Sequence, residues 1–183
     1  KVGKNAIIVG CSGGYSHLLR IILIIKSYLQ MGNMNLSFTG EFEYSLDKKN
    51  RLIIPARFRK SLGDINDKTF VLTRGLDDCL TLYPLNEWNN VERQLGQLST
   101  IKEKNRNFIR NVVRYAAYLK YDGQGRIAIP TSLLSHAKIK KEVVLIGMIK
   151  KIEIWDTDVL NKASYDNYTS SKDFEDLANE IDF

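Results

Sequence analysis

Two short segments of this 183-residue chain carry residue types that bind anions, and they carry them at the same spacing. The first segment, Asp47–Arg51, reads Asp-Lys-Lys-Asn-Arg, and the second, Asp122–Arg126, reads Asp-Gly-Gln-Gly-Arg. An arginine can hold a phosphate or donate two hydrogen bonds to a guanine, and a glutamine can read an adenine. A lysine adds attraction to phosphate that weakens as salt rises. The two segments therefore have the residues needed to bind a polyanion such as DNA.

Five residues of these segments are the candidate DNA contacts: Lys48, Lys49, Arg51, Gln124 and Arg126. The first segment holds three cations and the second only one, so we expect the first to be the main phosphate clamp. An alternative stays open for the arginines. Each could pair with the aspartate of its own segment across the base of a turn, and an exposed pair of this kind stabilises a fold by only ~0–1 kcal/mol.

The histidines and cysteines offer no comparable site. A four-ligand zinc site would need all four of them, and their spacing matches no zinc-binding pattern: Cys11, Cys79, His17 and His136. No serine or cysteine lies in a recognisable nucleophile turn, and neighbouring acids such as Asp77 and Asp78 are more typical of a turn than of a catalytic pair. We therefore predict that the protein is not an enzyme and needs no metal or cofactor.

An internal repeat positions the two segments. Leu46–Pro55 recurs 75 residues later as Tyr121–Pro130, with the aspartate, arginine and proline all in register. Two apolar strands follow in each copy, at an offset that slips from 73 to 72 residues: Phe70–Leu72 with Leu80–Tyr83, and Val143–Leu145 with Ile152–Trp155. The chain is thus a tandem repeat of one supersecondary unit of about 50 residues.

Each copy has a readable local structure. Alternating polar and apolar residues over 41–46 predict a half-buried strand, and the aspartate and asparagine that follow favour a turn. The return strand would complete a hairpin, and the next proline suits the first turn of a short helix. The predicted elements are strands 41–46 and 51–54, a helix over 56–62, strands 70–73 and 79–83, and in copy two a helix near 132–137 and a turn near 148–151.

Two further helices are predicted between the copies, over 85–98 and 102–115. In the second of these, four apolar residues recur at helical spacing on one face: Phe108, Ile109, Val112 and Val113. We interpret that face as packing against the core of the protein.

Charge is unevenly distributed along the chain, whose formal net charge is +6. Residues 1–33 contain four bases and no acid, residues 34–155 are strongly basic, and residues 156–183 contain eight acids and two lysines. A basic middle with an acidic end suggests a polyanionic partner for the middle and a solvated or self-masking tail. Surface lysines that merely keep the protein soluble are an equal alternative on charge alone.

Residues 1–33 differ in composition and pattern from the rest of the sequence. Their apolar run over 18–29 is too short to span a membrane and is interrupted by Arg20 and Lys26. The stretch 7–14 reads as a strand and a glycine turn, but no second strand of a phosphate-binding unit follows. We interpret residues 1–33 as a cloning or start-site extension outside the functional domain.

The doubled motif and its surroundings resemble a known family. The pattern Asp-x-x-Gly-Arg-hydrophobic-x-hydrophobic-Pro, followed by Thr73–Leu80 and by Tyr83–Trp88, is similar to the MraZ family of bacterial transcription regulators. The resemblance covers roughly Met34 to Leu160, and both copies match. It implies an α+β fold of two tandem AbrB-like swapped-hairpin β units, which form a pseudo-dimeric barrel with flanking helices.

The resemblance also implies that the two turns are the DNA-contacting elements, and Lys49, Arg51 and Arg126 match the family's turn directly. Asn50 stands where the family has glycine, and asparagine also tolerates positive φ. Gln124 stands where the family has lysine, which places the phosphate contact of the second turn in doubt. Asp78 replaces a usual glycine in the second hairpin of copy one, so that turn can differ in shape. Family members form homo-oligomeric rings that bind short direct repeats upstream of their own gene, at the head of a division and cell-wall gene cluster.

We therefore predict a cytoplasmic, nucleoid-associated and sequence-specific DNA-binding transcriptional regulator. Its partners would be double-stranded DNA at its own promoter repeats and further copies of itself in a ring, with no role for a membrane. The alternative is a protein-binding AbrB or antitoxin-like module without specific DNA readout. The predicted segments are 1–33 (extension), 34–98 (first unit with helix), 99–160 (connecting helix and second unit) and 161–183 (acidic tail).

Overall fold

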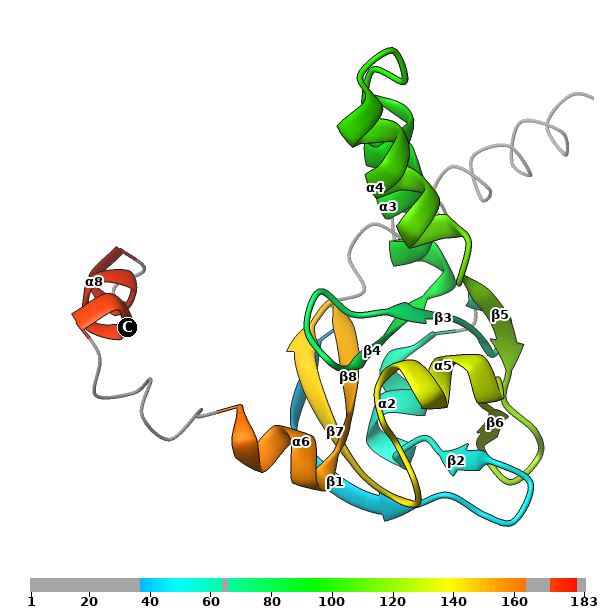
Figure 1. The fold of residues 1–183 in the computed structure, drawn as a ribbon. Helices are drawn as coiled ribbons and strands as arrows, with labels where there is room; N and C mark the ends of the chain where they lie inside the picture. The colour runs from blue at the N-terminus through cyan, green and yellow to red at the C-terminus, as the bar shows by residue number, and fades with distance from the viewer. Residues whose placement is uncertain (1–36, 64–65, 164–171, 181–183) are drawn as a thin grey trace, which may run out of the picture. The chain divides into compact units, whose positions relative to one another are not determined.

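The computed structural model describes residues 37–63, 66–163 and 172–180. The predictions made for residues 1–33 lie outside the described residues. The fold is α+β, as predicted, and Figure 1 labels its elements. In chain order these are β1 (Phe38–Ser45), β2 (Arg51–Ile53), α2 (Ala56–Ser61), β3 (Thr69–Arg74), β4 (Leu80–Pro84), α3 (Leu85–Gly96), α4 (Glu103–Val113), β5 (Ala117–Lys120), β6 (Arg126–Ala128), α5 (Thr131–His136), β7 (Glu142–Ile149), β8 (Lys151–Asp156), α6 (Thr157–Lys162) and α8 (Lys172–Glu180).

The strands form two antiparallel sheets. The larger has six strands in the order β1-β7-β8-β4-β3-β5, and the smaller pairs β2 with β6. Strands β1, β3 and β4 of copy one are equivalent to strands β5, β7 and β8 of copy two. The sheet is therefore symmetric, because each strand and its equivalent lie at the same distance from opposite edges. At the centre, β4 of copy one pairs with β8 of copy two, with Leu80 opposite Ile154 and Leu82 opposite Ile152. The two copies therefore share one sheet.

The predicted pairing of strand 41–46 with strand 51–54 is wrong. β1 pairs along its whole length with β7 of the other repeat, and β2 pairs with β6. This exchange places Leu52 opposite Ile127, and both side chains are fully buried. An isolated hairpin has no second layer against which to bury such residues. In this fold each repeat supplies the strands against which the other repeat buries its apolar residues.

The other predicted elements of the repeats are confirmed. β3 and β4 form the second hairpin of copy one, and β7 and β8 form that of copy two. The short helices α2 and α5 each begin directly after a proline, Pro55 and Pro130, whose missing N–H costs nothing at that position. Gly63 follows the end of α2 with a φ of 68°, a conformation that glycine adopts without a Cβ clash.

The core lies between the two sheets and the short helices. It contains the central apolar residues of both repeats, and Phe58 of α2 packs edge-on against Phe38 and Phe42. Its fully buried side chains include Phe38, Leu52, Ile54, Phe58, Phe70, Leu72, Leu80, Leu82, Ile127, Leu145, Ile152 and Ile154. This core holds β2 and β6, and with them the turns that precede those strands.

The interpretation of the apolar face of α4 as core packing is correct only in part, since Ile109 and Val112 are half-buried rather than buried. Phe108 is 47% exposed, Val113 is 43% exposed, and no residue of α4 is buried. Figure 1 shows α3 and α4 side by side, projecting from the edge of the sheet as a helical hairpin. Helical spacing shows that residues share a face, but it does not show what covers that face. None of the helices in the described ranges is long and apolar enough to cross a membrane.

Candidate nucleic-acid interface

Turn one, residues 47–51, is closed by its aspartate. One carboxylate oxygen of Asp47 accepts hydrogen bonds from the backbone N–H groups of Lys49 at 2.8 Å and Arg51 at 3.0 Å. The other oxygen accepts from the Arg51 guanidinium, with Nε at 2.7 Å and Nη2 at 2.6 Å. Asn50 takes a φ of 54°, as its place in the turn requires. A single carboxylate thus fixes both the backbone of the turn and the arginine side chain.

Turn two, residues 122–126, repeats this arrangement. Asp122 accepts from the backbone N–H groups of Gln124 at 2.9 Å and Arg126 at 3.0 Å. Its second oxygen accepts from Nε of Arg126 at 2.9 Å and from Nη2 at 2.6 Å. Gly125 has a φ of 78° and occupies the place of Asn50. The two turns have the same geometry despite different residues at their centres.

Both aspartates are firmly ionised. The hydrogen bonds from the Arg51 side chain lower the pKa of Asp47 to about 2, and those from Arg126 lower the pKa of Asp122 to about 2. Backbone N–H groups favour the same charged form. Each arginine therefore faces a full negative charge throughout the physiological pH range.

Strand exchange brings the two turns together. The backbone N–H of Ile54 donates to the carbonyl of Gly125 at 2.9 Å, and the N–H of Ile129 donates to the carbonyl of Asn50 at 2.9 Å. Figure 1 shows β2 and β6 side by side, with the loops that contain the turns at one side of the protein. The candidate residues of the two repeats therefore belong to one surface.

The structure separates the five candidate residues into two groups. Lys48, Lys49 and Gln124 are exposed. The side chains of Arg51 and Arg126 are only 30% and 21% exposed, because each is bound to its aspartate. The pairing that the sequence left open is thus present in both turns. The most accessible cations among the five are the two lysines of turn one.

Sequence reasoning missed one basic residue at turn two. Arg59 of α2 lies against Gly125, so closely that a Cβ on the glycine would stand 2.6 Å from Nε and Cζ of the arginine. Nε of Arg59 donates to the carbonyl of Ile54 at 3.0 Å, and its guanidinium lies 5.9 Å from the centre of the Tyr121 ring. Aligning the two repeats could have pointed to this residue, because Arg59 of copy one corresponds to the apolar Leu134 of copy two.

A guanidinium from copy one thus stands beside the turn of copy two. Turn two carries a single cation of its own, Arg126, whereas turn one carries three. Arg59 reduces this imbalance, and it does so only because the repeats exchange strands. Its neighbours Arg57 and Lys60 on α2 are basic and reach solvent, while copy two has serines at both equivalent positions.

Among the described residues, no group of three or more His, Cys, Asp or Glu side chains is close enough to hold a metal ion. Burial raises the pKa of the Cys79 thiol to about 12, and a thiol in that state is a poor nucleophile.

Comparison with known proteins identifies the family. The model of the family described as "MraZ protein, putative antitoxin-like" matches residues 37–111 and 113–180. A protein of Pediococcus pentosaceus is 48% identical over 149 residues, covering 80% of this chain and 98% of its own length. Proteins of Natranaerobius thermophilus and Caldanaerobacter subterraneus subsp. tengcongensis are each 43% identical, over 79% and 78% of this chain and 96% and 95% of their own lengths. All three are named "Transcriptional regulator MraZ". The chain belongs to the MraZ family.

Proposed function

We propose that this protein is a transcriptional regulator that binds double-stranded DNA through turn one and turn two. The observation that carries the proposal is the joining of two equivalent turns into one surface by the hydrogen bonds of Ile54 and Ile129. Exposed lysines and a glutamine project from a rigid base there, and the relatives named above are transcriptional regulators.

The residues take different roles in this proposal. Lys48 and Lys49 contact phosphates, which fixes the position of the protein on the duplex but carries no sequence information. Arg51 and Arg126 contact DNA with guanidinium groups that Asp47 and Asp122 hold in one orientation. A guanidinium held in this way loses less side-chain entropy when it binds. Gln124 reads a base edge or replaces the family's lysine at a phosphate.

The fold behind this surface is, in our proposal, a pair of AbrB-like swapped-hairpin units that together form a pseudo-dimeric barrel. The exchange of β1 and β5 between repeats supports it, since each pairs with a strand of the other copy. The pairing of β2 with β6 supports it in the same way.

The DNA target and the assembly follow from the family resemblance. We propose that the protein binds short direct repeats upstream of its own gene, at the head of a division and cell-wall cluster. It would do so in the cytoplasm, at the nucleoid, as a homo-oligomeric ring. Several copies that bind adjacent repeats would add weak contacts through multivalency. The net charge of +6 supports attraction to DNA.

Fluorescence anisotropy tests the proposal. The probe is the duplex immediately upstream of this protein's own coding sequence, with a scrambled duplex of the same composition, at two salt concentrations. Lys48→Gln/Lys49→Gln should weaken binding to both duplexes. The matched control Lys102→Gln/Lys104→Gln removes two exposed lysines at the start of α4 and should change binding little. Tight binding to the native duplex alone, lost in the turn variant, is the expected result.

A protein-binding module of the antitoxin type is the second candidate, because the family description contains that term. The acidic segment 156–183 would then contact a partner protein. Equal and weak binding to both duplexes, unchanged in the turn variant, would favour this candidate over specific DNA readout.

A further inference from the structure

A cavity of about 380 Å³, the Arg74 cavity, lies between the sheet and the helical hairpin of α3 and α4. Its volume is in the range of small-molecule sites, which measure ~300–1,000 Å³. Thr73 of β3 fixes one wall, because its hydroxyl donates to the carbonyl of Val112 in α4 at 3.0 Å. None of the five candidate DNA contacts lines the cavity. The proposed function therefore leaves it unexplained.

The lining of the Arg74 cavity is largely apolar and aromatic. Trp88 of α3 is 1% exposed and lies against Tyr83, with the ring centres 5.8 Å apart. Three large apolar side chains that line the cavity are also exposed to solvent: Leu76, Leu98 and Phe108. An apolar ligand in the cavity would cover part of this surface, including the face of α4 that the chain leaves partly exposed.

The charge of the cavity is positive. Arg74 and Lys151 line it, and none of the described residues that line it is acidic. Lys151 pairs with Glu153 at 3.2 Å, whereas Arg74 forms no ion pair with the described part of the chain. Arg74 is therefore the cation that remains available to a ligand.

The guanidinium of Arg74 is held in place but keeps an unused donor. Its central carbon lies 3.4 Å from the centre of the Tyr115 ring, in a cation–π contact. That contact uses the face of the guanidinium, whereas the N–H groups point outward in its plane. Nε is buried and has no hydrogen-bond acceptor among the described residues. A buried donor without a partner costs free energy, and an anion bound at this guanidinium would reduce that cost.

The walls of the cavity also exclude water. Burial raises the pKa of Tyr83, which lies between Trp88 and Lys151 in the lining. An ion pair is stronger in such surroundings than at an open surface, because the effective dielectric constant is lower. One unpaired cation among apolar walls suits an organic anion that has an apolar body.

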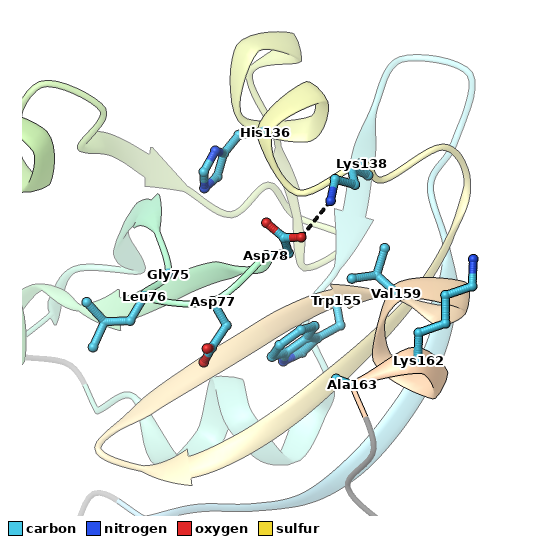
Figure 2. Close-up of a pocket in the computed structure, with 10 residues that line it drawn as sticks. All are labelled: Gly75, Leu76, Asp77, Asp78, His136, Lys138, Trp155, Val159, Lys162 and Ala163. Atoms are coloured by element: carbon cyan, nitrogen blue, oxygen red, sulfur yellow. Dashed lines mark hydrogen bonds and ion pairs between the residues drawn. The ribbon is translucent and has the colours of Figure 1, made fainter.

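Figure 2 shows a larger cavity, of about 670 Å³, that also borders the loop between β3 and β4. Its two acids, Asp77 and Asp78, come from that loop. Two lysines balance them, and one of these, Lys138, pairs with Asp78 at 2.5 Å. An anion that entered this larger cavity would meet two carboxylates. The Arg74 cavity is therefore the better of the two sites for an anion.

We propose that the Arg74 cavity binds an amphipathic organic anion, of the class of medium-chain carboxylates. The acid group pairs with the guanidinium of Arg74, and the apolar body lies between Trp88 of α3 and Phe108 of α4. The inference goes beyond the proposed function, because this site shares no residue with turn one or turn two. It assigns the protein a small-molecule ligand in addition to DNA.

Titration calorimetry of the full chain with three ligands of equal length tests the inference. The ligands are octanoate, octan-1-ol and octylamine, at pH 7 and without DNA. Octanoate should bind about ten-fold more tightly than octan-1-ol, since it adds a charged hydrogen bond at Arg74, and octylamine should bind least. Equal affinities would indicate an unselective apolar surface and would overturn the inference. Absence of octanoate binding would overturn it too, including the case in which a second copy of the chain covers the cavity.

Substitution of the arginine tests its role directly. Arg74→Gln should remove the preference for octanoate over octan-1-ol. The matched control is Arg114→Gln, since Arg114 also lies over the Tyr115 ring, at 5.4 Å, but does not line the cavity. It should keep the preference. Circular dichroism melts would verify that both variants fold, and an unchanged preference in folded Arg74→Gln would overturn the pairing of the anion with Arg74.

Two neighbouring valines of α4 locate the ligand. Val112 is half-buried and lines the cavity, whereas Val113 is 43% exposed and does not. Val112→Phe places a larger side chain in the cavity and should weaken octanoate binding. Val113→Phe makes the same change outside it and should bind octanoate as the wild type does. If Val112→Phe also binds octanoate as the wild type does, the ligand lies elsewhere and the inference is wrong.

The inference and the proposed function can fail separately. Lys48→Gln/Lys49→Gln, which should weaken DNA binding, should bind octanoate as the wild type does. If octanoate binds with the expected preference but no duplex binds, the ligand site stands and the DNA function fails. If the native duplex binds specifically but octanoate shows no preference over octan-1-ol, the ligand site fails alone.

Discussion

A carboxylate oxygen of Asp47, in the first repeat, lies 4.0 Å from Nη1 of Arg126, in the second. Each residue also keeps a closer partner in its own turn, Arg51 for Asp47 and Asp122 for Arg126, both at 2.6 Å. The four side chains therefore form one line of alternating charge across the junction of the repeats. Such a network orients its members more strictly than separate exposed pairs, which contribute little to stability.

The stability of the turns should depend on acid pH. Asp47 and Asp122 have pKa values lowered to about 2, below the ~3.9 of an aspartate in an unfolded chain. Their stabilising contribution is therefore complete above pH ~4 and is lost as the pH falls towards 2. Urea unfolding between pH 2.5 and 6 should show this loss in the wild type.

The variant Asp47→Asn/Asp122→Asn removes both titrating groups. It should be less stable than the wild type at pH 6, and the difference between the two proteins should shrink as the pH falls. A constant difference over this range would show that the two carboxylates act through something other than their charge. Asp67 and Asp78, whose pKa values are also lowered, are present in both proteins and do not affect the comparison.

Adding a cation to turn two should strengthen DNA binding. Gln124 is exposed, and its backbone N–H alone is used to close the turn. Gln124→Lys should therefore leave the fold intact and raise affinity for native and scrambled duplexes alike. A new phosphate contact should steepen the dependence of log affinity on log salt by ~0.9. Ser99→Lys, which adds the same charge at an exposed position between α3 and α4, is the control and should have a smaller effect.

Local chemistry was enough to predict the turns. An aspartate at the start and an asparagine or glycine before the arginine predict a turn with positive φ, and Asn50 and Gly125 have φ values of 54° and 78°. The prolines before α2 and α5 predict where those helices begin. These features depend only on residues a few positions apart, so one copy of the repeat contains all the information.

Local sequence was not enough to predict which strands pair with one another. Alternation over residues 41–46 shows which side chains are buried, but it does not distinguish pairing with the neighbouring strand 51–53 from pairing with β7. The position of Arg59 depends on that choice, because α2 reaches Gly125 only when the repeats exchange strands. The partly exposed face of α4 is a similar case, since helical periodicity does not reveal which other element covers that face.

The one cysteine among the described residues should be inert in the folded protein. Cys79 is 1% exposed, and burial raises its pKa to about 12. At pH 8 its thiolate fraction is then orders of magnitude below that of a free cysteine, whose pKa is ~8.5. In a Cys11→Ser background, a disulfide reagent should react slowly with native protein and rapidly in urea. Rapid reaction of the native protein would show that the β3–β4 hairpin opens readily.

The two glycines of turn two should respond differently to the same substitution. Gly125 has a φ of 78°, where a Cβ costs ~1–2 kcal/mol, and that Cβ would also displace Arg59. A Cβ added to Gly123 would meet no neighbouring atom within 4 Å, and this glycine lacks positive φ, so Gly123→Ala serves as the control. Urea unfolding should show a loss of ~1–3 kcal/mol for Gly125→Ala. The change for Gly123→Ala should stay within about 0.5 kcal/mol.

Substituting Arg59 separates the two contributions to the destabilisation caused by Gly125→Ala, which are backbone strain and displacement of the Arg59 side chain. In an Arg59→Ala background the displaced side chain is gone, and only the backbone strain remains. The destabilisation caused by Gly125→Ala should therefore be smaller there than in the wild type, and the difference measures the coupling between the residues. An equal loss in both backgrounds would mean that Arg59 moves aside freely. In that case the guanidinium is not held in place beside turn two.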